Sequence, residues 1–86
     1  MDSNFDSIRE NLAASIKGLR QAKGLSQESL ALSANVDRTY VSQIERGVGN
    51  PSLLILSRLA QVLQVRLPSL LNGVKAGDGE LPSNGA

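Results

Sequence analysis

The feature that most constrains this chain is residues 27–46, QESLALSANVDRTYVSQIER, which predict two short helices joined by a tight turn. Ser26 and Asp37 are suited to begin these helices, because their side-chain oxygens accept hydrogen bonds from the free backbone N–H groups at a helix start. Asn35 stands between the helices, where a sharp turn needs a residue that tolerates positive φ. We therefore expect a helix on each side of Asn35, the second of them ended by Gly47.

The second of these helices carries an unusual polar face. Its apolar residues Val41 and Ile44 lie three apart and are expected to face inward, which leaves a continuous polar face of Arg38, Thr39, Ser42, Gln43 and Arg46. A solvated helix face usually carries Glu and Lys, whereas Arg, Thr, Ser and Gln are residue types that read base edges and contact phosphates. With a small residue, Ala31, in the first helix, the spacing is that of a helix-turn-helix motif. A generic helical hairpin with a polar surface is the less favoured alternative.

Composition excludes several classes of function. The chain has 86 residues, enough for one small domain, and its two aromatic residues leave an aliphatic core, which suits small helices. It contains no Cys and no His, so it lacks thiolate ligands, the commonest metal ligand and the usual general base. We therefore expect no enzyme activity, no catalytic residues, no cofactor, no metal and no small-molecule substrate. No signal peptide or membrane-length apolar run is visible, so we expect a cytoplasmic protein without a membrane partner.

The charge balance argues for binding by more than one copy. The net charge is +1, and the first 50 residues hold six basic and six acidic side chains. A positive field for nucleic acid must therefore come from the placement of residues such as Lys17, Arg38 and Arg46 rather than from their number. A near-neutral monomer would bind DNA weakly, so we expect dimerisation to be needed for useful affinity.

The regions on either side of the motif also predict helices. Asp6 or Ser7 could cap a helix running to Lys23, with residues 1–5 frayed or extending it, and its apolar face would be Ile8, Leu12, Ile16 and Leu19. Gly18 interrupts that pattern and is expected to mark a close contact between helices. Ser52 should cap a helix over residues 53–63, with an inner stripe of Leu56, Leu59, Ala60 and Leu63.

The C-terminal part of the domain is more apolar than one edge of a small domain requires. Pro68 suits the first turn of a last short helix ending at Leu71. We expect a two-fold dimer interface formed by Ile55, Val62, Leu67, Leu70 and Leu71. The alternative is that these side chains only close the core of the monomer. Residues 73–86, GVKAGDGELPSNGA, read as a flexible tail because they are rich in Gly and lack apolar periodicity.

These features together resemble a known family. From Ile16 to Leu71, the segments IKGLRQAKGLSQESLA, VDRTYVSQIERG and NPSLLILSRLAQVLQV resemble the Xre/Cro-like (lambda-repressor-like) helix-turn-helix regulators. DRTYVSQIERG is similar to the recognition helix of restriction–modification controller proteins, which are small, dimeric and autoregulatory. The resemblance implies an all-α, compact five-helix DNA-binding domain over residues 1–72, with the motif at 27–46 and a dimerisation region at about 53–71.

The resemblance also implies roles for individual residues. Base contacts would come from Arg38, Thr39, Ser42 and Gln43, and contacts with the DNA backbone from Gln27, Tyr40, Arg46 and Asn50. Gln27 would also support the recognition helix. Arg38 would be the bidentate reader of a guanine, and Thr39 would contact a thymine methyl group. Arg20 and Glu45 match a buried ion pair of the family, although their spacing alone favours two unrelated surface charges.

Five positions depart from the family pattern. Gln64 stands where Gly is usual before the last short helix, which predicts a strained or altered turn there. Ser29 replaces an acidic residue, so the capping box is missing, and Asn35 replaces the common Gly of the motif's turn. Leu54 and Ile55 stand where polar residues are frequent, which favours an interface.

The expected function is sequence-specific binding of double-stranded DNA by a transcriptional regulator. The expected partners are a near-palindromic operator and a second copy of the chain, with RNA polymerase as a further candidate, and the regulated genes would be those of a restriction–modification system. The alternative is an antitoxin-type or coactivator-type module that uses the same fold to bind protein through residues 73–86. That tail has only Val74 and Leu81 as large apolar groups, which is little for such a role.

Overall fold

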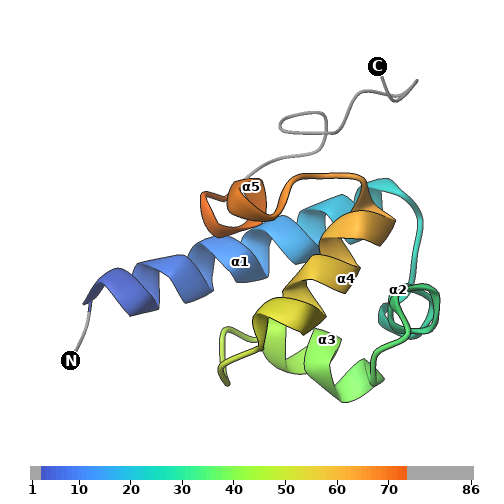
Figure 1. Cartoon of the computed structure of the whole chain (residues 1–86), viewed down its shortest axis with the longest axis horizontal. Coiled ribbons are helices and arrows are strands. Elements are labelled where there is room, and N and C mark those ends of the chain that lie inside the picture. The colour runs from blue at the N-terminus through green and yellow to red at the C-terminus, as the bar shows by residue number, and fades with distance from the viewer. Residues whose placement is uncertain (1–2, 74–86) are drawn as a thin grey trace.

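The computed structural model describes residues 3–73, and this part of the chain forms five helices and no strand. They are α1 (Ser3–Ala22), α2 (Gln27–Ala34), α3 (Arg38–Glu45), α4 (Leu53–Leu63) and α5 (Leu67–Leu71), arranged as in Figure 1. The expectation of a five-helix, all-α domain is therefore confirmed. The tail predicted for residues 73–86 lies, apart from Gly73, outside the described residues.

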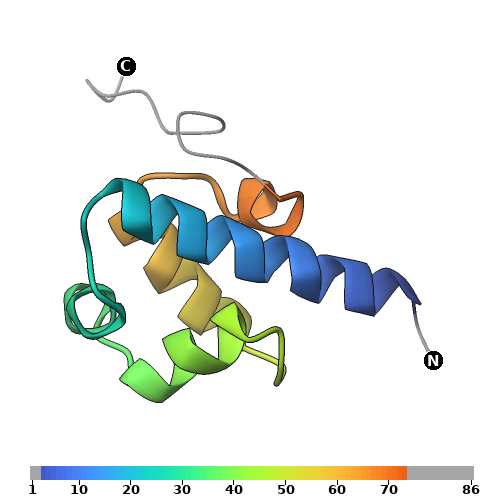
Figure 2. The same ribbon diagram turned by 180° about the vertical axis from the view of Figure 1, so that it is seen from behind.

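The first helix begins earlier than the capping pattern predicted. Neither Asp6 nor Ser7 is a cap, because both lie inside α1, and the Asp6 carboxylate pairs with Arg9 at 2.9 Å. The Arg9 guanidinium also lies over the ring of Phe5, 4.9 Å from its centroid. These contacts three and four residues apart stabilise the first turns, which extend past the other helices in Figures 1 and 2. Of the two possibilities stated for residues 1–5, frayed or part of the helix, the second is correct for residues 3–5.

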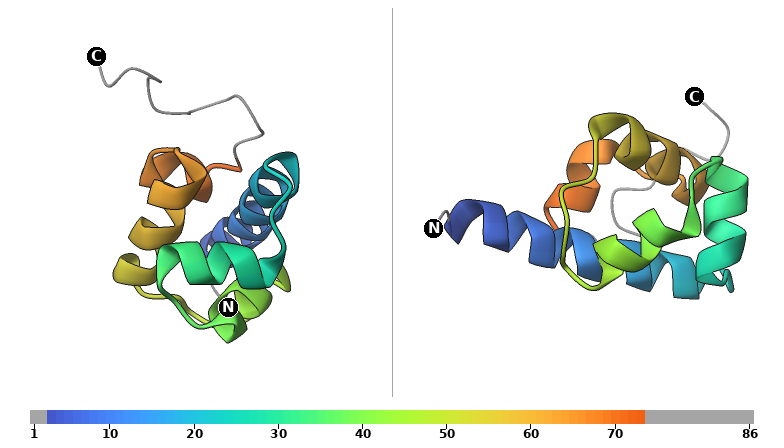
Figure 3. Two further views of the ribbon diagram at one scale, coloured as in Figure 1. Left: turned by 90° about the vertical axis from the view of Figure 1, so that its right-hand side faces the viewer. Right: turned by 90° about the horizontal axis from the view of Figure 1, so that it is seen from below.

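The core is aliphatic and lies where the five helices meet. Fourteen apolar side chains are buried there, contributed by every helix and by Val65 between α4 and α5. The inner stripe predicted for α4 is confirmed, since its buried residues are Leu56, Leu59, Ala60 and Leu63. α1 packs against both α3 and α5, and α2 packs against α3 and α4, as the two views of Figure 3 allow the reader to follow.

Two sequence-based expectations need correction. Gly18 does not mark a close helix contact, because it is exposed and a side chain added there would meet no atom within 4 Å. Leu70 is fully buried within the monomer, so it has no surface to offer a second copy. The short helix α5 turns Leu70 toward α1, and the Asn11 amide of α1 donates a hydrogen bond to the Leu71 carbonyl at 3.3 Å. Leu70 thus closes the monomer core, as the alternative stated.

Candidate nucleic-acid interface

The turn between α2 and α3 is built as the sequence indicated. The Ser26 hydroxyl accepts a hydrogen bond from the Ser29 N–H at 2.9 Å, which caps α2 without an acidic residue at that position. Asn35 ends α2 in the left-handed region, with φ at 57°. Its carbonyl accepts a hydrogen bond from the Arg58 guanidinium of α4 at 3.1 Å. The turn is therefore fixed both by local backbone geometry and by a neighbouring helix.

Helix α3 has one buried side and one exposed side. Val41 and Ile44 are buried, so the opposite side of the helix faces solvent. On α3 and its C-cap, the residues proposed for DNA contact divide into exposed ones, Arg38, Thr39, Tyr40 and Arg46, and half-buried ones, Ser42 and Gln43. The structure therefore exposes an arginine and a threonine together at the first turn of α3.

Asp37 caps α3 and carries a perturbed carboxylate. Its Oδ1 accepts a hydrogen bond from the Thr39 backbone N–H at 2.8 Å. That bond, with help from the Thr39 hydroxyl and the charge of Arg38, holds the pKa of Asp37 below its usual value of 3.8. The cap therefore stays ionised at neutral pH and fixes the first turn of α3.

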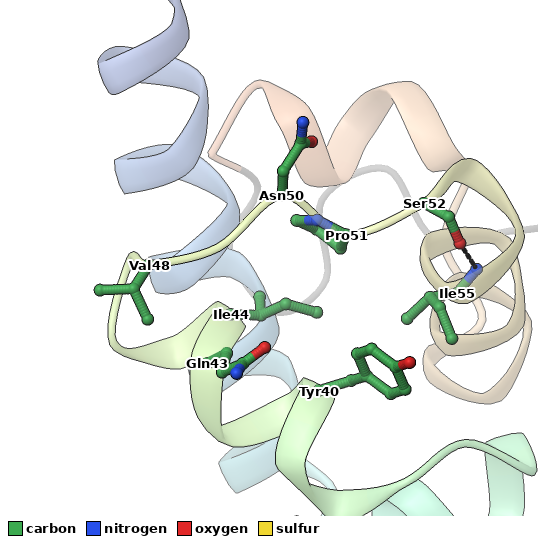
Figure 4. Close-up of a pocket in the computed structure, with 8 residues that line it drawn as sticks. All are labelled: Tyr40, Gln43, Ile44, Val48, Asn50, Pro51, Ser52 and Ile55. Carbon is green, nitrogen blue, oxygen red and sulfur yellow. Dashed lines mark hydrogen bonds between the residues drawn. The ribbon is translucent and has the colours of Figure 1, made fainter.

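A groove of about 310 Å³ lies between α3, the following loop and the start of α4 (Figure 4). Tyr40 and Gln43 line it from α3, and Asn50 and Ser52 line it from the loop. Three residues proposed for DNA contact, Tyr40, Gln43 and Asn50, are thereby brought to one concave surface. The groove was not predictable from the sequence, where Ser52 was assigned only as a helix cap, because the path of a loop leaves no periodic pattern.

An ion pair behind α3 joins it to α1. The Arg20 guanidinium donates two hydrogen bonds to the Glu45 carboxylate, from Nε at 2.6 Å and from Nη2 at 3.0 Å. A third, from Nη1 to the Leu25 carbonyl, measures 2.8 Å. The Glu45 side chain is 5% exposed, and its hydrogen bond raises the pKa of Arg20. The pair lies where the family resemblance places it and fixes the end of α3 to the core.

Gln27 connects this ion pair to the exposed start of α3. Its amide nitrogen donates to the Glu45 carboxylate at 3.1 Å, and its amide oxygen accepts from Arg38 Nη1 at 3.4 Å. Gln27 is the first residue of α2, so one side chain links α2 to both ends of α3. The family resemblance implies that Gln27 contacts phosphate and supports the recognition helix. Its partners, Glu45 and Arg38, were not predictable, because they lie 18 and 11 positions away from Gln27 without any repeat.

The residues proposed for a dimer interface differ in how much surface they present. Ile55, Val62, Leu67 and Leu71 are partly buried against the core cluster. Leu54, beside Ile55 at the start of α4, is 59% exposed. Apart from Leu70, each proposed residue can therefore present part of its side chain to a second copy.

Comparisons with known proteins agree with this geometry. A family model described as helix-turn-helix matches residues 16–70. Control protein C.SmaI from Serratia marcescens is 38% identical over 91% of this chain and 95% of its own length. Control protein C.BamHI from Bacillus amyloliquefaciens is 34% identical over 87% of this chain and 94% of its own length.

A solved structure shows the same likeness. The restriction–modification controller protein C.AhdI from Aeromonas hydrophila superposes with a TM-score of 0.64 at 38% sequence identity. The match covers 80% of this chain and 98% of that chain.

No helix among residues 3–73 has the length and hydropathy that crossing a bilayer requires. The chain belongs to the helix-turn-helix family of DNA-binding transcriptional regulators, which are not enzymes, and is similar to its restriction–modification controller proteins.

Proposed function

We propose that this protein is an autoregulatory controller of a restriction–modification system that binds a near-palindromic operator as a homodimer in the cytoplasm. Two copies related by a two-fold axis would place their α3 helices in successive major grooves, with half-site centres about 10 bp apart. Arg38, Thr39, Ser42 and Gln43 contact bases, and Gln27, Tyr40, Arg46 and Asn50 contact the DNA backbone.

The observation that carries this proposal is the division of α3 into two sides. Val41 and Ile44 are buried, while Arg38 and Thr39 at its first turn are exposed. A helix anchored on one side, with hydrogen-bonding groups on the other, has the shape that a major groove accepts. The likeness to control proteins over almost their full length supports the regulatory role.

Selection of binding sites from random duplex DNA, followed by gel shifts over protein concentration, tests the proposal. We expect a two-fold symmetric consensus, two copies bound per site and an affinity that falls steeply with salt. Retention of asymmetric sequences by a single copy would contradict the homodimer. A parent protein that shifts no selected duplex at low salt would contradict DNA recognition itself.

Arg38→Ala is the sharpest test of the base readers. We expect it to reduce discrimination at one base pair of each half-site by about 1–3 kcal/mol, because a bidentate guanine contact is lost. Arg46→Ala should instead weaken binding to all duplexes about equally, since its proposed contact is a phosphate. Arg66→Ala, at the exposed N-cap of α5, is the control and should leave both quantities unchanged. Equal discrimination by the parent and Arg38→Ala would show that the reader is misassigned.

The antitoxin or coactivator alternative depends on residues 73–86, of which all but Gly73 lie outside the described residues. Co-purification of a small protein partner through that segment would favour it. Among residues 3–73, no feature points to such a partner more strongly than to DNA.

A further inference from the structure

The hydrogen bonds behind α3 form one continuous chain from the core to the exposed start of the helix. The Arg20 guanidinium holds the Glu45 carboxylate, the carboxylate accepts from the Gln27 amide, and that amide accepts from Arg38. The inner end of this chain of hydrogen bonds is largely shielded from solvent, since the side chains of Arg20 and Glu45 are 12% and 5% exposed. Its outer end, Arg38, is exposed at the start of α3. A buried charge is therefore connected to the proposed guanine reader through a single amide.

The charge of Glu45 fixes which way the Gln27 amide points. An ionised carboxylate can only accept hydrogen bonds, and a guanidinium can only donate them. The amide therefore presents its NH2 group to Glu45 and its oxygen to Arg38. A flipped amide would place two acceptors face to face at Glu45 and two donors face to face at Arg38. Glu45 cannot turn away, because two guanidinium hydrogen bonds from Arg20 hold it. The direction of the Gln27 oxygen is thus set from inside the protein.

The stability of α3 alone does not account for a carboxylate at this position. Glu45 is the last residue of α3, where the partial charge of the helix end is negative and disfavours an acidic side chain. The contact from Arg38 to Gln27 is long, at 3.4 Å, so it can direct the guanidinium and still release it to a base. Preorganising a long side chain in this way reduces the conformational entropy lost on binding.

We propose that Glu45 is a positioning residue which, through Gln27, directs the Arg38 guanidinium and so sets discrimination at the base pair that Arg38 reads. This inference rests on the proposed DNA-binding function. It assigns to the buried ion pair a role in specificity in addition to its role in packing. The effect should be confined to one base pair of each half-site, because the other proposed base readers, Thr39, Ser42 and Gln43, are not part of the chain of hydrogen bonds.

The contact is tested first in the DNA-free protein, by NMR relaxation of the arginine side-chain Nε–H groups. In the parent, we expect the Arg38 order parameter to exceed that of Arg66. Gln27→Met keeps a side chain of similar length and leaves the ion pair intact but loses both amide hydrogen bonds, so the Arg38 value should fall below about 0.6. Glu45→Gln, where circular dichroism shows it folded, should have the same effect. Leu59→Val is the control, since the Leu59 side chain is buried in the core and makes none of these hydrogen bonds, so its truncation should lower the melting temperature alone.

Discrimination is then measured with the selected operator and with a duplex changed at the base pair read by Arg38. We expect Gln27→Met and Glu45→Gln to reduce the ratio of the two dissociation constants about five- to tenfold, with the ratio at other base pairs unchanged. An Arg38 order parameter that is unchanged in Gln27→Met or in folded Glu45→Gln would overturn the inference, and so would unchanged discrimination in these variants when the parent binds DNA. A parent that binds no duplex would overturn the proposed function as well. If Glu45→Gln does not fold, Glu45→Asp is measured in its place, because it keeps the charge but shortens the side chain that accepts from Gln27.

Discussion

Ser15 is a polar residue placed where the core offers it no partner. It is fully buried on α1, and its hydroxyl makes no hydrogen bond among the described residues. A buried hydroxyl without a partner loses its hydrogen bonds to water on folding, and Ala is also the better helix former. Ser15→Ala should therefore raise the free energy of unfolding by about 1 kcal/mol, which is about 4–8 °C in melting temperature for a domain of this size.

The neighbouring residue supplies the control for that prediction. Ala14 is exposed on the same helix, so Ala14→Ser measures the difference in helix propensity without the burial. The gain from Ser15→Ala should exceed the loss from Ala14→Ser. Equal and opposite changes would show that the buried hydroxyl itself costs nothing.

Asp37 makes the stability of α3 depend on pH. Its pKa in the folded protein lies below the usual 3.8, chiefly because of the hydrogen bond from the Thr39 backbone N–H. The stabilisation from the ionised cap is therefore complete well above pH 3.8 and is lost as the pH falls through the lower, folded-state pKa. Asp37→Asn keeps an N-cap acceptor and removes the titration, so melts of both proteins from pH 7 to pH 2.5 check this. The parent should lose more stability on acidification than Asp37→Asn, and parallel curves would contradict the assignment.

At the scale of the elements, the end of α4 carries local strain. Gln64 lies in the left-handed region with φ at 61°, as its replacement of a family Gly suggested. A residue with a Cβ is disfavoured in that region, whereas Gly adopts it freely. Gln64→Gly should raise the free energy of unfolding by about 0.5–1 kcal/mol, measured by urea denaturation. Because Lys23 also donates a hydrogen bond to the Gln64 side chain at 2.9 Å, Gln64→Ala is the control that loses only this bond. If Gln64→Gly is no more stable than Gln64→Ala, strain at this turn is negligible.

The elements also show what a sequence can and cannot reveal. The stripe on α4, the caps at Ser26 and Asp37 and the turn at Asn35 were predictable, because each depends on residues within one turn of a helix. For the start of α1, the sequence left frayed and helical residues as two possibilities, since the choice depends on the contacts of Arg9 with two side chains. The groove beside Tyr40 and the partners of Gln27, Glu45 and Arg38, were missed, because helix packing brings their residues together from separate segments.

For the molecule as a whole, the main question is how a nearly neutral chain binds a polyanion. The net charge of +1 gives little general attraction to DNA, so affinity must come from where the cations lie and from the number of copies bound. Arg38 and Arg46 lie at opposite ends of α3, and this places one positive charge at each end of the proposed reading helix. A symmetric pair of copies doubles these contacts at the entropic cost of a single association with DNA.

The dimer can be tested without DNA by substituting an exposed apolar residue of α4. Leu54 is 59% exposed, so Leu54→Glu should leave the monomer folded while placing a charge at the proposed interface. We expect the dimer to dissociate at least ten times more readily, a change of about 1.4 kcal/mol, as measured by sedimentation equilibrium. Leu32→Glu makes the same change at a 76% exposed position of α2 and should leave the dissociation constant of the dimer unaltered. Equal constants for the parent and both variants would place the interface elsewhere. A monomer with so little net charge should bind DNA weakly. Dissociation of the dimer by Leu54→Glu should therefore also weaken operator binding, even though Leu54 belongs to neither set of proposed DNA contacts.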